Sequence, residues 1–291
     1  MSKVILFQKM VFIIHQRRDI IAAWLKTTEK KMRGLILLLA VLLPLSSSAD
    51  SSLPFMKDRV GDRELPRPWG LGLDFYTMDQ DYDIKDLQFA LPGVIVGDPS
   101  AIAVTNDVQH FDIKGDVWLL PFLNVFGLVG RMSTDTVVDF SDADIQGLPP
   151  GFSLGDLPVS FDGTVYGLGF TLAYGTESWF TSLTTTFTKT STSGDLDSTV
   201  KSTSVQPRIG LLRDKWRFWV GAMYLDTDET HSGVFELPFI GPVPFSVELV
   251  TKDSWNYTAG TGYVFSDRAD LSFEVGFGPR SHTLFNFNYR F

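Results

Sequence analysis

Alternation of side-chain character is the feature that most constrains this chain. At the C-terminus, apolar or aromatic residues occupy every second position toward Phe291 and mostly polar ones lie between them. The same period of two recurs at residues 166–174, 255–265 and 271–277. Because successive side chains of a strand point to opposite faces, this pattern predicts strands with one apolar and one polar face. It favours a β-rich protein over a helical one.

Three details favour a membrane barrel over a soluble sandwich. The apolar faces begin or end with Trp, Tyr or Phe, as an aromatic girdle at a membrane interface requires. The opposite faces are too rich in glycine and charge to form a sandwich core. The chain also ends on an aromatic residue inside its last amphipathic strand. We therefore predict an all-β fold, an antiparallel up-and-down transmembrane β-barrel over residues 69–291.

The expected strands number ten, and even counts are typical of single-chain bacterial barrels. Short connections alternate with longer ones, which assigns both barrel ends of the chain to the periplasmic side. The longer links contain further β-prone runs, so twelve strands remain the alternative. The ten strands are expected at residues 69–79, 108–119, 124–133, 164–174, 179–189, 202–211, 216–226, 254–265, 270–278 and 282–291.

The first 68 residues are expected to lie outside the barrel. Lys30, Lys31 and Arg33 precede the apolar stretch Leu35–Leu45, and small residues follow it up to Ala49. This order is typical of a secretory signal peptide. We expect residues 32–49 to be that signal and residues 1–31 to be a misassigned upstream extension, or else part of a long basic leader. Residues 50–68, which hold three prolines among charges, are expected to form a periplasmic tether or a segment that enters the lumen.

Composition excludes several classes of protein. The absence of cysteine excludes disulfide scaffolds, thiolate zinc sites, iron–sulfur clusters and cysteine nucleophiles. The net charge of −9 argues against nucleic acid as a partner, because such binding needs a basic surface. Asp-x-Asp spacing in two expected loops suits calcium, but no EF-hand pattern follows it. We expect no cofactor and no metal site; the acidic loop residues are Asp79, Asp81, Asp83, Asp86, Asp135, Asp139, Asp142 and Asp144.

The signal pattern together with the terminal Tyr289-Arg290-Phe291 resembles Gram-negative outer-membrane β-barrel proteins of the small, porin-like class. No subfamily is indicated. The resemblance implies a location in the cell outer membrane, with outer-membrane lipid and lipopolysaccharide as neighbours. It also implies that the barrel-assembly machinery reads the last strand, through Phe287, Tyr289 and Phe291.

The polar faces of the strands are expected to line the lumen. A ten-stranded barrel is only slightly wider than the eight-stranded type, whose interior is filled by side chains. Since buried charges must pair, we expect an ion-pair network that plugs the lumen, with a gated polar conduit as the alternative. The expected network is Asp74, Lys114, Asp116, Arg131, Arg208, Glu274 and Arg290; Tyr76, His110, Asp112 and Arg217 fall on the same face.

Some outer-membrane barrels cleave lipids, and such enzymes resemble one another in a His–Ser pair near the outer lipid interface. The candidates here are His231-Ser232 and Ser281-His282. Adjacent residues on a strand point to opposite faces, so neither dipeptide forms a base–nucleophile contact by itself. We therefore expect no enzymatic activity and no catalytic residue.

The expected function is that of a structural or interaction protein of the cell surface, which binds a surface ligand through long acidic loops. A narrow channel for small solutes is the alternative, and a lipid-modifying hydrolase is the third hypothesis.

Overall fold

The structure is a computed structural model that describes residues 52–61, 65–90, 93, 95–141, 143–147, 155–192, 197–237 and 241–291. The expected signal peptide and upstream extension lie outside the described residues. Among the described residues, no helix is long and apolar enough to cross a membrane. The elements are the 3₁₀ turns η2 (Lys57–Arg59) and η3 (Pro99–Ala101) and the strands β1 (Trp69–Phe89), β2 (Ile95–Val96), β3 (Ala103–Leu120), β4 (Leu123–Asp139), β5 (Ile145–Gln146), β6 (Asp156–Gly175), β7 (Trp179–Ser191), β8 (Asp197–Arg213), β9 (Trp216–Leu237), β10 (Gly241–Thr251), β11 (Trp255–Val264), β12 (Ala269–Phe277) and β13 (Ser281–Arg290).

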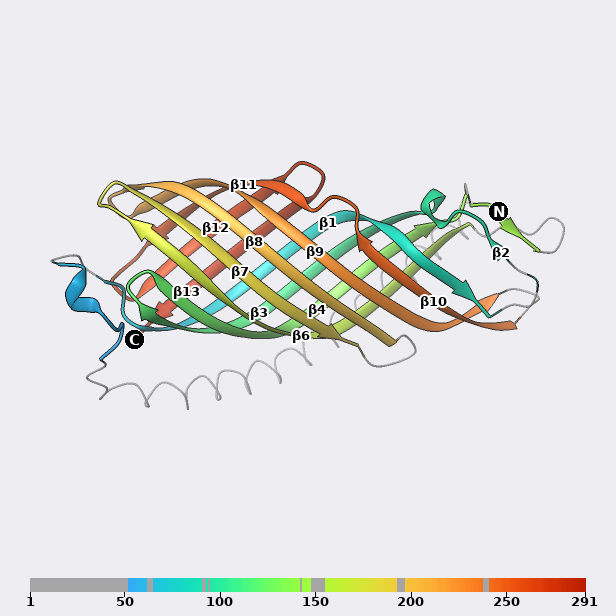
Figure 1. Ribbon diagram of the computed structural model, residues 1–291, viewed down its shortest axis with the longest axis horizontal. Helices are drawn as coiled ribbons and strands as arrows, with labels where there is room; N and C mark the ends of the chain where they lie inside the picture. Colours follow the sequence, from blue (N-terminus) through green and yellow to red (C-terminus); the bar gives the residue numbers. More distant parts are fainter. Residues whose placement is uncertain are drawn as a thin grey trace, which may run out of the picture. The chain divides into compact units, whose positions relative to one another are not determined.

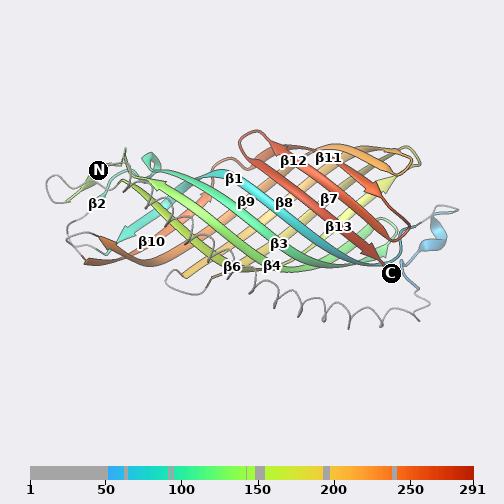
Figure 2. The ribbon, with the colours of Figure 1, turned by 180° about the vertical axis from the view of Figure 1, so that it is seen from behind.

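Ten strands close into an antiparallel ring. Its order is β1, β3, β4, β6, β7, β8, β9, β11, β12 and β13, and β13 returns to β1 with Arg290 opposite Gly70. Figure 1 shows these strands running obliquely around the barrel, and Figure 2 shows β13 beside β1 from behind. The closed ring confirms the expected all-β barrel. Short turns lie at the end that holds Phe291, which is the periplasmic end in this architecture.

Several strands continue beyond their expected ranges at the opposite, extracellular end. There β10 pairs on one side with β9, from Gly241 opposite Leu237 to Val250 opposite Asp228. On its other side β10 pairs with β1, from Thr251 opposite Tyr82. It thereby takes the place in the wall of three short strands, β11, β12 and β13, which end below it. We call this region the outer extension: residues 80–89, 103–107, 134–139, 156–163 and 226–237 together with β10.

The outward faces of the ring form an apolar belt below the outer extension. Large apolar side chains there are mostly exposed, with exposed fractions of 64% for Leu168, 61% for Val220 and 66% for Tyr257. A continuous apolar exterior of this size is unfavourable in water and is expected where strands face hydrocarbon. The belt therefore marks the part of the barrel that spans the membrane. Aromatic residues at its periplasmic margin are Trp69, Tyr174, Trp179, Trp216 and Phe265.

Apolar side chains also gather inside the barrel, in two clusters at different heights. The inner cluster consists of Met78, Val108, Met132, Val165, Val200 and Leu225. The outer cluster lies within the outer extension and consists of Tyr82, Ile84, Ile102, Val104, Phe140 and Leu249. The outer extension is thus packed around a core in the manner of a soluble domain, and this core lies across the extracellular end of the lumen.

Candidate functional site

The lumen below the outer cluster holds a cavity of about 620 Å³. Arg290 and Asn124 line it near the periplasmic end, and Tyr82 and Glu229 line it near the outer extension. Tyr82 also belongs to the outer cluster, so its ring forms part of the roof. The charged side chains of the lumen therefore do not fill it completely. Gly260 lies directly opposite Trp219 on the neighbouring strand, and its lack of a Cβ leaves the room that the Trp219 ring occupies.

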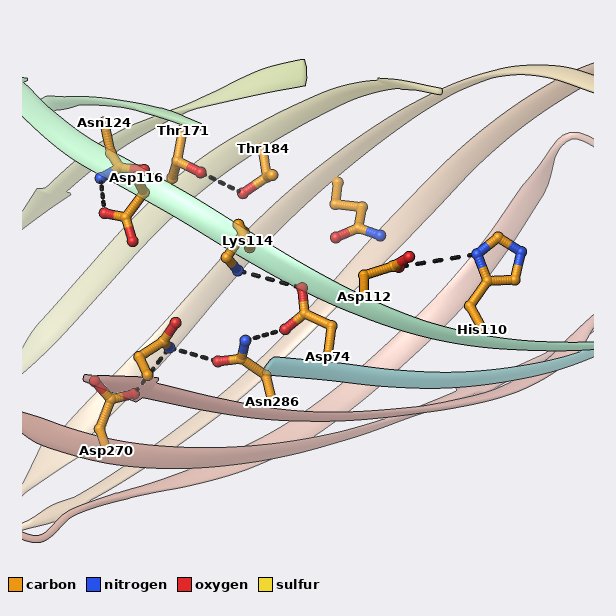
Figure 3. Close-up of polar contacts among 12 residues, drawn as sticks. Asp74, His110, Asp112, Lys114, Asp116, Asn124, Thr171, Thr184, Asp270 and Asn286 are labelled. Carbon is orange, nitrogen blue, oxygen red and sulfur yellow. Dashed lines mark hydrogen bonds and ion pairs between the residues drawn. The ribbon is translucent and has the colours of Figure 1, made fainter. Parts of the chain in front are cut away.

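Six of the seven expected network residues lie in the lumen as three ion pairs, and a fourth pair joins Arg217 to Asp270 at 2.7 Å. Figure 3 shows the arrangement around Asp74 and Asp116. All eight residues of these pairs line the cavity. The N–O distances in the three pairs are 3.4 Å for Lys114–Asp74, 2.9 Å for Arg290–Asp116 and 2.6 Å for Arg208–Glu274.

Glu274 is the most enclosed acid of the lumen, with 1% of its surface exposed. Arg208 donates to it through Nε at 2.6 Å and through Nη2 at 2.8 Å. Trp219 donates its indole N–H to the same carboxylate at 2.5 Å. A bidentate guanidinium and a third donor satisfy a carboxylate well, so this pair is held in a fixed geometry on the cavity wall.

Amides extend the network toward the periplasmic end. Asn124 donates to Asp116 at 2.5 Å, and Asn286 donates to Asp74, as Figure 3 shows. The Arg290 guanidinium lies over the Trp118 ring, 5.8 Å from its centroid. Each carboxylate here therefore has at least two partners, which fixes the wall of the cavity at this end.

Arg131 does not belong to the network. It is exposed on the outward face of β4, opposite Phe111 of β3, whose ring is also exposed. Its neighbour Met132 faces inward instead and joins the inner apolar cluster. The expectation failed because it placed Arg131 on the polar face of its strand, which in the membrane part faces the lumen. At the height of Arg131 the strands leave the apolar belt, and above it charges face outward while apolar side chains face inward.

Asp112 is a lumen carboxylate without a full set of partners. It is 8% exposed and lines the cavity, and its Oδ1 has no hydrogen-bond partner among the described residues. The nearest basic group is the ring of His110, whose Nδ1 lies 3.9 Å from Oδ2, beyond hydrogen-bond range. Gly130 lies directly opposite on β4, and its hydrogen leaves the room that the carboxylate occupies. The hydroxyl of Tyr76, on the adjacent strand β1, also lacks a partner among the described residues.

His231 contacts a serine on the neighbouring strand rather than Ser232, the serine that follows it in the sequence. Its Nδ1 lies 2.7 Å from the hydroxyl of Ser198, directly opposite on β8, and its Nε2 lies 2.9 Å from Glu229. All three residues are about 95% buried. His231 lines a small apolar cavity of about 40 Å³ in the outer extension, whereas Ser198 lines neither this cavity nor the lumen cavity. The other candidate pair is split, with Ser281 outside and His282 inside.

The segment before β1 and the last strand meet at the periplasmic rim. The peptide N–H of Phe291 donates to the carbonyl of Trp69 at 3.0 Å, and the Tyr289 and Phe291 rings pack edge to face at 5.4 Å. Phe287 lies on the same outward face of β13. Arg67 donates to Asp267 in the turn between β11 and β12 at 2.7 Å, and this bond holds the pKa of Asp267 below its usual range.

No group of three or more acidic or histidine side chains is arranged as a metal centre in the part of the chain that the structure describes. The aspartates of the outer extension face outward, whereas Glu229 faces inward. Asp79, Asp107 and Asp135 occupy directly opposite positions on three adjacent strands, β1, β3 and β4. They form a ladder of like charges just above the apolar belt.

No protein-family model matches the chain, and no curated protein sequence is similar to it. Among solved structures, the chain is similar to the outer membrane protease OmpT from Escherichia coli, with 9% identity, 78% of this chain, 97% of that chain and a TM-score of 0.39. It is similar to the outer membrane protein OprG from Pseudomonas aeruginosa, with 12% identity, coverages of 78% and 98% and a TM-score of 0.39. A third match is the β domain of the Bordetella autotransporter BrkA, with 14% identity, coverages of 77% and 100% and a TM-score of 0.38.

The chain's own features are a closed ring of ten strands, an apolar belt and an aromatic margin, which together form the architecture of a transmembrane barrel. The chain is thus an integral membrane β-barrel.

Proposed function

We propose that the barrel is a narrow conduit for a small solute, held closed at its extracellular end in this conformation. The observation that carries the proposal is the lumen cavity of about 620 Å³ beneath a roof of packed apolar side chains. A cavity of this size falls within the range of small-molecule sites. A barrel serving only as a scaffold would gain stability by filling that space, because cavities cost packing energy.

The roof makes the proposal testable by conductance in planar bilayers. The wild-type barrel is expected to show no steady, porin-sized conductance. Replacing Tyr82→Ala together with Leu249→Ala removes two large side chains of the outer cluster and is expected to produce a small, steady conductance. The matched control, Tyr82→Phe with Leu249→Met, keeps the volume and should stay closed. A wide open pore in the wild type, or no ion flow in the double alanine variant, would refute the closed conduit.

A role in surface interactions is a second candidate, supported by the acidic exterior of the outer extension. The ladder of Asp79, Asp107 and Asp135 costs stability, because like charges directly opposite one another repel. Keeping such a ladder is understandable if a positively charged surface ligand offsets the repulsion. The test is adhesion of cells to a cationic surface, which should fall for the triple Asp→Asn variant if this role holds.

We propose no enzymatic role. The Ser198–His231–Glu229 arrangement has triad-like distances, but the position of Ser198 away from both cavities supports a structural use of its hydroxyl. Purified barrel should not cleave phospholipid or lipid A. Cleavage by the wild type that is lost in Ser198→Ala would overturn this proposal.

A further inference from the structure

The charges that line the lumen cavity do not balance. Four acids are paired with the four Lys and Arg side chains of the lining, at 2.6 to 3.4 Å. Two acids of the lining are left over, Glu229 and Asp112. Glu229 is hydrogen-bonded to His231, whereas Oδ1 of Asp112 has no hydrogen-bond partner among the described residues and Oδ2 lies 3.9 Å from Nδ1 of His110.

Asp112 is buried, so a carboxylate oxygen without a hydrogen-bond partner there costs stability. It is 8% exposed, and burying a carboxylate without a compensating partner is costly. Its strand neighbours do not supply a cation. Lys114, two residues along β3, is directed to Asp74, and Arg131 lies on the outside of the barrel. Figure 3 shows Asp112 with His110 beside it and Lys114 turned toward Asp74.

The surroundings of Asp112 change character along the barrel axis. Toward the periplasm the cavity wall carries the paired charges, and toward the outer extension it carries the inner apolar cluster, including Met132 and Val108. Asp112 lies at the boundary, with the unpartnered hydroxyl of Tyr76 on the next strand. The cavity thus combines a carboxylate with one unpartnered oxygen, the unpartnered hydroxyl of Tyr76 and an apolar wall. A mostly apolar site with a few placed polar groups is the usual form of a ligand pocket.

We propose that the lumen binds a small organic cation, with its ammonium group on the Asp112 carboxylate and its apolar body against the Met132 side of the cavity. This inference rests on the proposed conduit and names the class of solute that it takes. The ammonium donates to Asp112, and the apolar part leaves water for the inner cluster, so charge and shape both contribute. A neutral molecule of the same size gains only the apolar part.

Equilibrium binding to the full-length barrel in detergent tests this without any need for transport. The probes are 2-phenylethylammonium and the neutral 2-phenylethanol, titrated by calorimetry. Wild-type protein is expected to bind the ammonium at least tenfold more tightly, the scale of one hydrogen bond between charged groups. In Asp112→Asn the two probes should bind alike. Asp107→Asn, the same change on the outward face of the same strand, should behave as wild type.

A wild-type barrel without preference for the ammonium would overturn the proposal, and so would an Asp112→Asn variant that keeps the preference. Asp112→Ser serves as the second variant if the amide disturbs assembly, with heat-modifiable gel mobility as the check on folding. The two proposals remain separable. Binding without any conductance in the double alanine variant refutes the conduit alone, and conductance without selective binding refutes the organic cation alone.

Discussion

At the scale of single residues, Glu274 is the lumen residue whose substitution we expect to destabilise the barrel most. It accepts three hydrogen bonds from Arg208 and Trp219 while only 1% of its surface is exposed. Glu274→Gln should destabilise the barrel by about 3–5 kcal/mol, because it leaves the Arg208 guanidinium enclosed without its counter-charge. Urea unfolding in lipid vesicles, followed by tryptophan fluorescence, measures the loss. Asp267→Asn breaks an exposed pair with Arg67 and should leave the unfolding midpoint unchanged; equal losses would contradict the account.

Also at this scale, Phe285 tests which face meets hydrocarbon. It lies outward between Phe75 and Phe273, and all three rings are more than 40% exposed. Phe285→Arg should cost about 2–4 kcal/mol if this row lies near the middle of the bilayer. Phe285→Leu keeps an apolar side chain and should cost much less in the same unfolding assay. A tolerated arginine would mean that the strand register is displaced by one residue.

At the scale of elements, the aspartate ladder joins β1, β3 and β4. Asp107 lies between Asp79 and Asp135, so Asp107→Asn removes two like-charge contacts at once. The barrel should gain about 0.2–1 kcal/mol per contact, and high salt should shrink the gain because it screens exposed charges. Thermal unfolding at low and high ionic strength measures both effects. A variant less stable than the wild type would show that the ladder is compensated in a way that these contacts do not reveal.

The same strands show why sequence predicted the ring but not the outer extension. In β1 the outward side chains change from Phe75 to Asp79, Asp81 and Asp83, while the inward ones change from Asp74 to Tyr82 and Ile84. The alternation continues, but its polarity inverts where the strand leaves the membrane. A rule fitted to the belt therefore ends each strand early and places Arg131 inside.

Two prolines at Pro242 and Pro244 hid β10, since proline is rare in strands, yet both fit on its outward face. Pro207 lies inside β8, and the pairing of β8 with β9 keeps one register on both sides of it. Alternation in the sequence was enough to predict most of the charged residues that line the lumen. The cavity could not be predicted in this way, because its size depends on how side chains from strands far apart in the sequence pack inside the barrel.

At the scale of the whole molecule, two environments are stacked in one barrel. The membrane part is apolar outside and polar inside, and the outer extension is the reverse. A polar lumen beneath an apolar core is closed by the hydrophobic effect, without a dedicated plug segment in the described part of the chain. In the conduit that we propose, this core seals the cavity from the extracellular side.

Thiol labelling tests that seal most directly, because the chain has no cysteine of its own. Ser204→Cys places a thiol on the cavity wall, and Ser232→Cys places one on the outward face of β9. Intact cells are treated with a small, membrane-impermeant thiol reagent. The account predicts labelling at position 232 but not at position 204, and labelling at 204 once Tyr82→Ala and Leu249→Ala are added. Rapid labelling at position 204 with the outer cluster unaltered would contradict it.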